Sequence, residues 1–178
     1  MVGGLIPYTR YMPQDTPTTE DKPTAYRLLF VCTGNTCRSP LAEVITRHAL
    51  EQRGWNHVQV DSAGTSAVWD APASEGSVRA AELVGLDLSG HRSQPLTREL
   101  IESADIILGM TPSHVGAVGD MGGDGKCSLI TEFIEGADSG QAISDPLGGP
   151  LEEYVEARDR ISQAVEALLN RLSAILSP

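Results

Sequence analysis

The sequence predicts an α/β fold in which a four-stranded parallel sheet lies between layers of helices, as a three-layer sandwich. Short apolar runs alternate along the chain with segments of helical periodicity, which is the order expected of a doubly wound parallel sheet. The run Asp105–Met110 is apolar after its first residue, as a central parallel strand should be. The chain has 178 residues, of which 40% are hydrophobic, and these values suit one domain with a substantial core.

Four strands are expected, and each has its own signal. The first, Tyr26–Val31, contains an apolar run, and the second, His57–Asp61, alternates apolar and polar residues. The third is Asp105–Met110, and the fourth, Cys127–Ile130, follows a glycine-rich segment. Because helix-forming segments separate the strands, all four should run parallel.

Helices are expected between the strands and after the last one. The first should occupy Ser39–Gln52, with Ser39 as N-cap, Pro40 at the first helical position and Gly54 as the stop. Three shorter helices follow from similar signals: Ser74–Val84, Thr97–Ser103 with Thr97 as cap, and one that starts at Thr111-Pro112 by the same cap-then-proline pattern. The last helix, Leu151–Leu176, carries a long apolar stripe that reaches Ile175.

The charge balance limits the possible partners. The formal net charge is -11 and the pI is about 4.7, so neither nucleic acid nor an anionic membrane is an expected partner. No apolar run approaches the ~18 residues of a membrane span, and no signal peptide is apparent. Three cysteines, two of them in one loop, argue against a secreted disulfide framework and favour the cytoplasm. Residues 1–24 are expected to be a flexible extension before a domain at 25–178.

A Cys-x5-Arg loop lies between the first strand and the first helix. A short loop that enters a helix points its N–H groups inward as an anion nest, and the helix N-terminus adds partial positive charge. Gly34 and Asn35 readily adopt the left-handed or otherwise unusual dihedrals that such a loop needs. Arg38 supplies a planar fork for two phosphate oxygens. The positive field favours the thiolate of Cys32, the candidate nucleophile, and the Ser39 hydroxyl is close enough in sequence to bond to it.

Other interpretations of this loop explain less. A buried structural Cys beside a capped helix accounts for one thiol but not for the whole set of strand, Cys, Gly-Asn, Arg-Ser-Pro and helix. A Walker A loop is excluded because no Gly-Lys-Ser/Thr ends the motif. Cleavage of phosphate monoesters or phosphoramidates is therefore favoured over nucleotide binding.

Cleavage of a phosphoryl bond needs a general acid for the leaving atom and then a base for water. Asp145, in the Gly/Pro-rich loop after the last strand, is the best-placed carboxylate by topology. Ser62 follows the second strand and either faces the Cys32 loop or is only a turn residue. Trp69 is either a half-buried anchor or one wall of a substrate cleft. His91 is expected to be a buried hydrogen-bonding residue or a surface residue, without a catalytic role.

Over residues 26–176 the chain resembles the low-molecular-weight protein tyrosine phosphatases. The resemblance rests on three segments in the family's order: Val31–Pro40, Asp61–Thr65 and Asp145-Pro146. It implies the phosphatase fold, phosphorylated protein substrates, oxyanion binding in the active site and a phosphocysteine intermediate, with no metal and no cofactor. The oligomeric state is not predicted.

The resemblance also implies roles for single residues. Cys32 would be the nucleophile, Arg38 the phosphate clamp, and Asp145 the general acid and then the base. The loop residues that would bind phosphate or brace the loop, with Ser62, are Thr33, Gly34, Asn35, Thr36, Cys37 and Ser39. Cys37 matches the family's second loop thiol, which can form a protective disulfide with Cys32.

Thr36 bears on the substrate. Tyrosine-specific members usually carry an aliphatic residue there, whereas a Thr-Gly-Asn-Thr-Cys-Arg-Ser loop resembles the bacterial protein-arginine phosphatases. A phosphoguanidinium has N–H donors for the Thr36 hydroxyl, whereas a tyrosine ring would leave that hydroxyl unpaired, at a cost of ~1–3 kcal/mol if dry. Leu147 departs from both types, which commonly carry an aromatic residue there, and Trp69 is expected to compensate.

Phosphoarginine in proteins is therefore the expected substrate, and phosphotyrosine is the alternative. Arsenate reductases share a similar loop, but they need further downstream redox cysteines, and this chain has only Cys127 there. A non-enzymatic phosphate-binding module would be expected to lose Cys32 or Asp145, and both are present.

Overall fold

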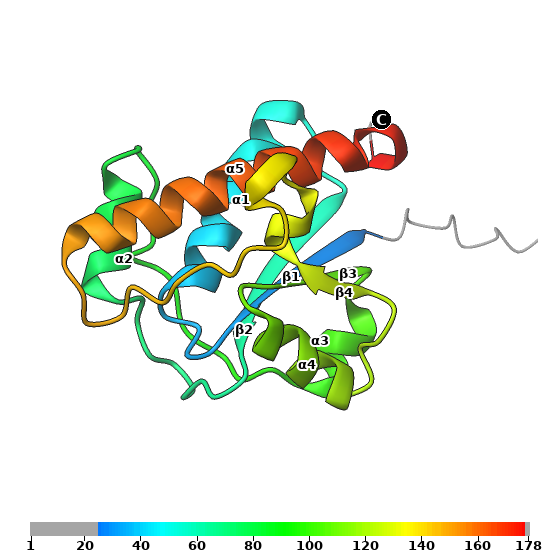
Figure 1. The fold of residues 1–178 in the computed structure, drawn as a ribbon, viewed down its shortest axis with the longest axis horizontal. Helices are drawn as coiled ribbons and strands as arrows, with labels where there is room; N and C mark the ends of the chain where they lie inside the picture. Colours follow the sequence, from blue (N-terminus) through cyan, green and yellow to red (C-terminus); the bar gives the residue numbers. More distant parts are fainter. Residues whose placement is uncertain (1–24, 177–178) are drawn as a thin grey trace, which may run out of the picture.

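The computed structural model describes residues 25–176, which form a parallel α/β sandwich (Figure 1). The strands are β1 (Tyr26–Cys32), β2 (Val58–Gly64), β3 (Ile106–Gly109) and β4 (Cys127–Leu129). They form a parallel sheet in the order β2-β1-β3-β4. The predicted four-stranded parallel sheet is confirmed, and the extension expected at residues 1–24 lies outside the described residues.

The C-terminal edge of the sheet gathers the segments that carry the motifs. Cys32, at the end of β1, is in register with Gly64 at the end of β2. Val31 is likewise in register with Gly109 at the end of β3. Parallel sheets of this kind place ligands at this edge. The Cys loop, defined here as residues 32–38, therefore starts beside the segments that leave β2 and β3.

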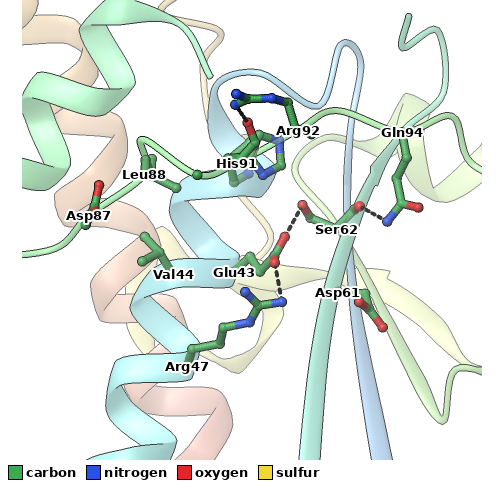
Figure 2. Close-up of a pocket in the computed structure, with 12 residues that line it drawn as sticks. Glu43, Val44, Arg47, Asp61, Ser62, Asp87, Leu88, His91, Arg92 and Gln94 are labelled. Carbon is green, nitrogen blue, oxygen red and sulfur yellow. Dashed lines mark hydrogen bonds and ion pairs between the residues drawn. The ribbon is translucent and has the colours of Figure 1, made fainter. Parts of the chain in front are cut away.

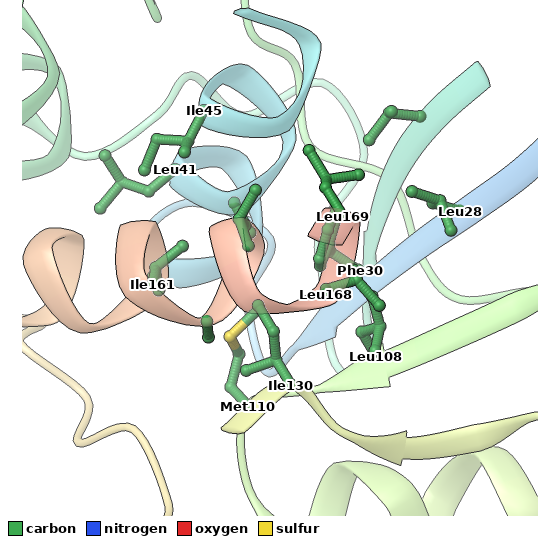
Figure 3. Packing of buried hydrophobic residues seen from close by; sticks show 14 of the residues in the cluster. Leu28, Phe30, Leu41, Ile45, Leu108, Met110, Ile130, Ile161, Leu168 and Leu169 are labelled. Atoms are coloured by element: carbon green, nitrogen blue, oxygen red, sulfur yellow. The ribbon is translucent and has the colours of Figure 1, made fainter. Parts of the chain in front are cut away.

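Helices cover both faces of the sheet (Figure 1). One face carries α1 (Arg38–Arg53), α2 (Glu75–Glu82) and α5 (Leu151–Leu176), and the other carries α3 (Arg98–Ser103) and α4 (Pro112–Asp120). Alternate residues of β1 enter two cores. Leu28 and Phe30 pack with α1 and α5 (Figure 3), while Leu29 and Val31 pack on the side of α3 and α4. The three layers therefore hold β1, and the thiol that ends it, at the centre of the molecule.

The start of α1 differs from the prediction. The helix begins at Arg38, with Cys37 at the N-cap position and no side-chain cap. Ser39 is not the N-cap, because its hydroxyl contacts the sulfur of Cys32 instead. The predicted stop is confirmed, since Gly54 ends the helix in the left-handed conformation with φ 69°. Ser39, which the sequence pattern predicts as an N-cap, therefore contacts the thiol of Cys32 instead.

Of the two threonines predicted to cap shorter helices, one does so and the other does not. Thr97 caps α3 as predicted, because its hydroxyl accepts a hydrogen bond from the N–H of Leu100 at 3.3 Å. Thr111 precedes α4, but its hydroxyl bonds to the ring of His114 and caps no backbone N–H. This prediction was wrong because a tertiary partner competes for the hydroxyl.

The segment after β4 was not predicted in detail. Two short 3-10 helices occupy it, η1 (Ile130–Phe133) and η2 (Gly136–Asp138), and β4 ends one residue earlier than expected. The apolar stripe of α5 ends on the buried Leu176, and Ile175 is exposed. None of the helices within residues 25–176 is both long enough and apolar enough to cross a bilayer.

Candidate active site

The Cys32 side chain is buried at the base of the Cys loop, directly after the core of β1. Asn35 lies in the left-handed region with φ 53°, and its backbone N–H donates to the Cys32 sulfur at 3.3 Å. The Ser39 hydroxyl oxygen lies 3.0 Å from the same sulfur. Gly34 does not have a positive φ, so the left-handed backbone predicted for this pair is found at Asn35. Both contacts suit a thiolate, which accepts hydrogen bonds.

Several donors of the Cys loop have no partner in the described part of the chain. Within residues 25–176, the N–H groups of Gly34, Thr36 and Cys37 donate to no other group of the protein. The buried Nε of Arg38 likewise has no partner in that part of the chain. A buried donor is costly unless something accepts its hydrogen bond. The loop therefore suits an anion that offers several acceptor oxygens.

Arg38 joins the Cys loop to the segment after η2. Its guanidinium is buried; Nη1 donates to the Ile143 carbonyl at 3.0 Å and Nη2 to the Asp145 carboxylate at 2.6 Å. The structure thus brings Asp145 to the edge where topology predicted it. The Asp145 side chain is 43% exposed, so it contacts both the Arg38 guanidinium and solvent. The N–H of Leu147 donates to its other oxygen at 3.3 Å, which orients the carboxylate.

Asn35 is the centre of the network that braces the loop. Its side-chain amide donates to the hydroxyls of Ser39 at 2.9 Å and of Ser62 at 2.8 Å. Its side-chain oxygen accepts from the N–H of Gln94 at 2.9 Å, and its carbonyl lies 2.7 Å from Nε2 of His91. All polar groups of this buried residue are engaged, which fixes the one left-handed position of the loop.

Figure 2 shows the pocket in which Ser62, a member of this network, faces Glu43 of α1. The Ser62 hydroxyl donates to the carboxylate of Glu43 on α1, and Arg47 pairs with the same carboxylate at 2.6 Å. These residues border a polar cavity of about 450 Å³ between α1, the end of β2 and the segment 87–94. Ser62 is the predicted site residue that lines this cavity, while the reacting groups do not. The cavity is therefore lined by residues that stabilise the Cys loop and not by the Cys32 thiol.

The segment 65–74 runs along the Cys loop and is tied to it at both ends. Its first N–H groups, of Thr65 and Ser66, donate to the carbonyls of residues 32 and 33 at 2.9 Å, and that of Ser74 donates to the carbonyl of Thr36 at 2.8 Å. The hydroxyl of Ser74 also lies 3.0 Å from the Cys37 sulfur. The Thr36 hydroxyl has a single weak contact in the described residues, the same sulfur at 4.0 Å. It is thus available to a ligand.

Gly64 permits this close approach. A Cβ atom on Gly64 would lie 2.5 Å from the carbonyl oxygen of Thr33 and 2.8 Å from the backbone nitrogen of Asn35. Backbone atoms cannot move aside as a flexible side chain can. The glycine at the end of β2 therefore lets the Cys loop pack directly against the strand.

Trp69 and Leu147 are exposed apolar side chains on two segments next to the Cys loop. Trp69 is 65% exposed, so the first of its two interpretations, a half-buried anchor, was wrong; Leu147 is 63% exposed. Trp69 belongs to the segment tied to the Cys loop, and Leu147 follows Asp145. Tyr154 supports the second segment by accepting a hydrogen bond from the N–H of Gly148 at 3.2 Å. Both exposed apolar side chains lie on segments that border the site.

His114 contacts the Cys loop from α4, and sequence reasoning missed it. The ring is buried, with Nε2 2.9 Å from the Thr33 hydroxyl and Nδ1 2.9 Å from that of Thr111. Burial, helped by the positive charge of Arg38 and opposed by Asp145, lowers the pKa of His114 to about 4. The imidazole is therefore neutral near pH 7, with one donor and one acceptor nitrogen.

The missed residues share a reason. Gln94 and His114 contact the Cys loop from 59 and 81 residues away, so no local spacing in the sequence indicates them. For His91, the interpretation as a hydrogen-bonding residue agrees with its contact to the Asn35 carbonyl. The role of Glu43 was missed because in the sequence it resembles any surface residue of a helix. Its i,i+4 spacing from Arg47 was the one available signal. No group of three or more His, Cys, Asp or Glu side chains in residues 25–176 could hold a metal ion.

A buried thiol, an anion nest, an arginine and a carboxylate thus meet at one edge of the sheet. This set can hold a phosphoryl group against a sulfur nucleophile and protonate the leaving atom. Residues 27–176 match the family model described as low molecular weight phosphotyrosine protein phosphatase.

Curated relatives and solved structures agree with that match. The chain is 39% identical to a protein-arginine-phosphatase of Geobacillus stearothermophilus, over 83% of this chain and 96% of the relative. It is 30% identical to the low molecular weight protein-tyrosine-phosphatase Etp of Escherichia coli strain K12, over 82% and 94%. A mutant of the YwlE arginine phosphatase with a phosphorylated active-site serine superposes with a TM-score of 0.77 at 35% identity, covering 84% of this chain and 97% of that one.

Proposed function

Because this chain belongs to the low molecular weight phosphotyrosine protein phosphatase family, we propose that it removes phosphate from phosphoarginine in proteins. The family itself is established: the chain is a cysteine-based phosphoprotein phosphatase that works through a phosphocysteine intermediate. The proposal concerns which residues perform the reaction and which phosphoryl bond they cleave.

In the first step the Cys32 thiolate attacks phosphorus, so that an S–P bond forms while the bond from phosphorus to the leaving nitrogen breaks. Asp145 gives its proton to that nitrogen, and the arginine side chain departs. The free N–H groups of the Cys loop and the guanidinium of Arg38 hold the phosphoryl oxygens as negative charge redistributes over them.

In the second step water attacks the phosphocysteine. The carboxylate of Asp145 takes a proton from the water, an O–P bond forms, and the S–P bond breaks with its electron pair returning to sulfur. Ser39 and the N–H of Asn35 stabilise the returning thiolate. Inorganic phosphate then leaves the nest.

One observation carries the assignment of these roles. The buried Nε of Arg38 and three backbone N–H groups of the Cys loop have no partners in the described residues, while the Cys32 sulfur already has two polar contacts, with the Asn35 N–H and the Ser39 hydroxyl. A merely structural thiol would not need unsatisfied donors around it. A phosphoryl group would satisfy them all.

The substrate class rests on the hydroxyl of Thr36. This hydroxyl has only a weak contact at 4.0 Å and can accept a hydrogen bond from a guanidino N–H, which a phenol ring lacks. We assign the exposed Trp69 and Leu147 as apolar walls because both lie on segments beside the Cys loop, and an aromatic ring can stack on a guanidinium or on a phenyl group. They therefore suit phosphotyrosine as a second substrate.

Arsenate reduction is less well supported. It would need a downstream thiol that reaches the Cys loop, whereas Cys127 lies in β4, two strands from β1. Burial raises the pKa of the Cys127 thiol to about 11, which disfavours the thiolate needed for exchange. We place the protein in the cytoplasm, because its free cysteines suit a reducing compartment.

The test compares hydrolysis of phosphoarginine and phosphotyrosine peptides of matched sequence. The wild type should have the higher kcat/KM on phosphoarginine. Thr36→Ile should lower that preference about tenfold or more, while Thr36→Ser, which keeps the hydroxyl, should retain it. A wild type that prefers phosphotyrosine would overturn the proposed substrate without affecting the assignment to the family.

A further inference from the structure

We propose that the Thr33 hydroxyl, oriented by His114, is a second group that selects guanidino N–H donors over phenol leaving groups. The proposal rests on phosphoarginine being the substrate and deepens it, because it adds a residue outside the position of Thr36. Thr33 would touch the substrate, and His114 would act through Thr33 as a positioning residue.

The contact between the two residues is well defined. His114 is only 4% exposed, and each of its ring nitrogens lies 2.9 Å from a threonine hydroxyl, Thr33 on one side and Thr111 on the other. The Thr111 hydroxyl is in turn 2.8 Å from that of Ser113. The ring therefore cannot rotate away without leaving a buried nitrogen unpaired.

Thr33 is well placed to meet a substrate. It follows Cys32 directly, its carbonyl is held by the N–H of Ser66 at 2.9 Å, and the residue is exposed at the surface of the site. Its hydroxyl lies 2.9 Å from the buried Nε2 of His114, which holds the side chain in one orientation. Thr33 is thus adjacent to the nucleophile in the chain and open to a ligand.

The ring determines what the hydroxyl offers. A neutral imidazole has one N–H and one bare nitrogen. The positive field of the Cys loop favours the bare nitrogen at Nε2, on the side of Thr33, and the N–H at Nδ1, on the side of Thr111. Thr33 then donates its proton to Nε2, and the lone pairs of its oxygen are left to accept. An acceptor beside the phosphoryl group fits a guanidino N–H and has no partner on a phenol.

The experiment uses paired substitutions of His114 in the full chain. The amide of His114→Gln reaches the place of Nε2 and keeps a partner for Thr33, whereas that of His114→Asn reaches the place of Nδ1 and keeps a partner only for Thr111. The ratio of kcat/KM on phosphoarginine to kcat/KM on phosphotyrosine peptides is measured for both. His114→Asn should lower this ratio about fivefold to tenfold, and His114→Gln should retain most of it.

Thr33→Val should lower the same ratio by a similar factor, and combining it with His114→Asn should lower it no further, since both remove one interaction. Ser113→Ala, at the outer end of the chain of hydroxyls, is the control and should leave the ratio unchanged. Circular dichroism and urea unfolding show which variants are folded, and the ratio is compared only among those.

A purely structural role for His114 would lower both activities equally, so an unchanged ratio in His114→Asn and Thr33→Val overturns the proposal. The proposed substrate is judged separately, by the wild-type ratio. A wild type that prefers phosphoarginine together with unchanged variant ratios would reject the role of Thr33 alone. A wild type that prefers phosphotyrosine would reject both the proposed substrate and the role of Thr33.

Discussion

Nη2 of Arg38 lies 2.6 Å from Oδ2 of Asp145, so the proposed phosphate clamp and the proposed acid are paired before any substrate is bound. The two residues are 107 positions apart, and the Ile143 carbonyl accepts from the other arm of the same guanidinium. An incoming phosphoryl group would compete with the carboxylate for this arginine. In the proposed mechanism the pair would therefore couple anion binding to the release of Asp145 toward the leaving atom.

This competition predicts opposite effects of Asp145→Asn on binding and on turnover. Removing the carboxylate charge frees Arg38, so the inhibition constant of inorganic phosphate should fall about two- to fivefold, the range of a partly exposed ion pair. The value of kcat should fall ~10²-fold, since no acid remains. Steady-state kinetics with phosphate as inhibitor measure both. Asp138→Asn, which removes an exposed carboxylate that does not pair with Arg38, is the control and should change neither.

Cys32→Ser should separate chemistry from binding. Turnover should fall about 10³-fold or more, because a hydroxyl in this position is a far weaker nucleophile than a thiolate. Phosphate affinity, measured by calorimetry, should stay within about threefold, since the free N–H groups and Arg38 remain. Cys127→Ser is the matched control and should retain full activity. Loss of activity in that control would instead point to redox chemistry that involves β4.

The sequence was most informative where structure is local. The strand, the Cys loop and the first helix are contiguous, so the position of Cys32 followed from one short segment and one rule about parallel sheets. Asp145 could be placed by the same rule, because the loop after the last strand returns to this edge. The limits of α1 were less accurate, since Ser39 gave its hydroxyl to the thiol and not to a helix cap.

The bracing contacts could not be predicted because they are pairwise and distant. Asn35 takes partners from β2 and from the segment that contains His91 and Gln94, and nothing in the spacing of those residues distinguishes them from ordinary loop residues. The same holds for Gly64, which reads as a turn glycine. A glycine is required at this position only because the backbone of Thr33 packs against it in the folded protein.

Gly64→Ala should disturb the Cys loop through this backbone contact. A methyl group 2.5 Å from a carbonyl oxygen forces the loop away from β2, so the free energy of unfolding should fall by about 1–3 kcal/mol and kcat/KM should fall with it. Urea unfolding and peptide hydrolysis measure the two effects. Gly116→Ala is the control: a Cβ there meets no atom within 4 Å in α4, and it should stabilise the protein by about 0.5–1 kcal/mol. An unperturbed Gly64→Ala protein would show that the loop can shift without cost.

The pKa of His114 predicts how stability depends on pH. In the folded protein the pKa is lowered from its ordinary value of 6.5 to about 4, so between these values the unfolded chain binds more protons on this residue. Stability should therefore rise with pH through this window and be fully present above it. Between a pH of about 7.5 and about 5, His114 should account for a loss of about 2 kcal/mol in the free energy of unfolding. His114→Gln, which does not titrate, should lose about that much less over the same range in urea titrations. Equal losses in wild type and variant would mean that the ring is protonated as readily in the folded protein as in the unfolded chain.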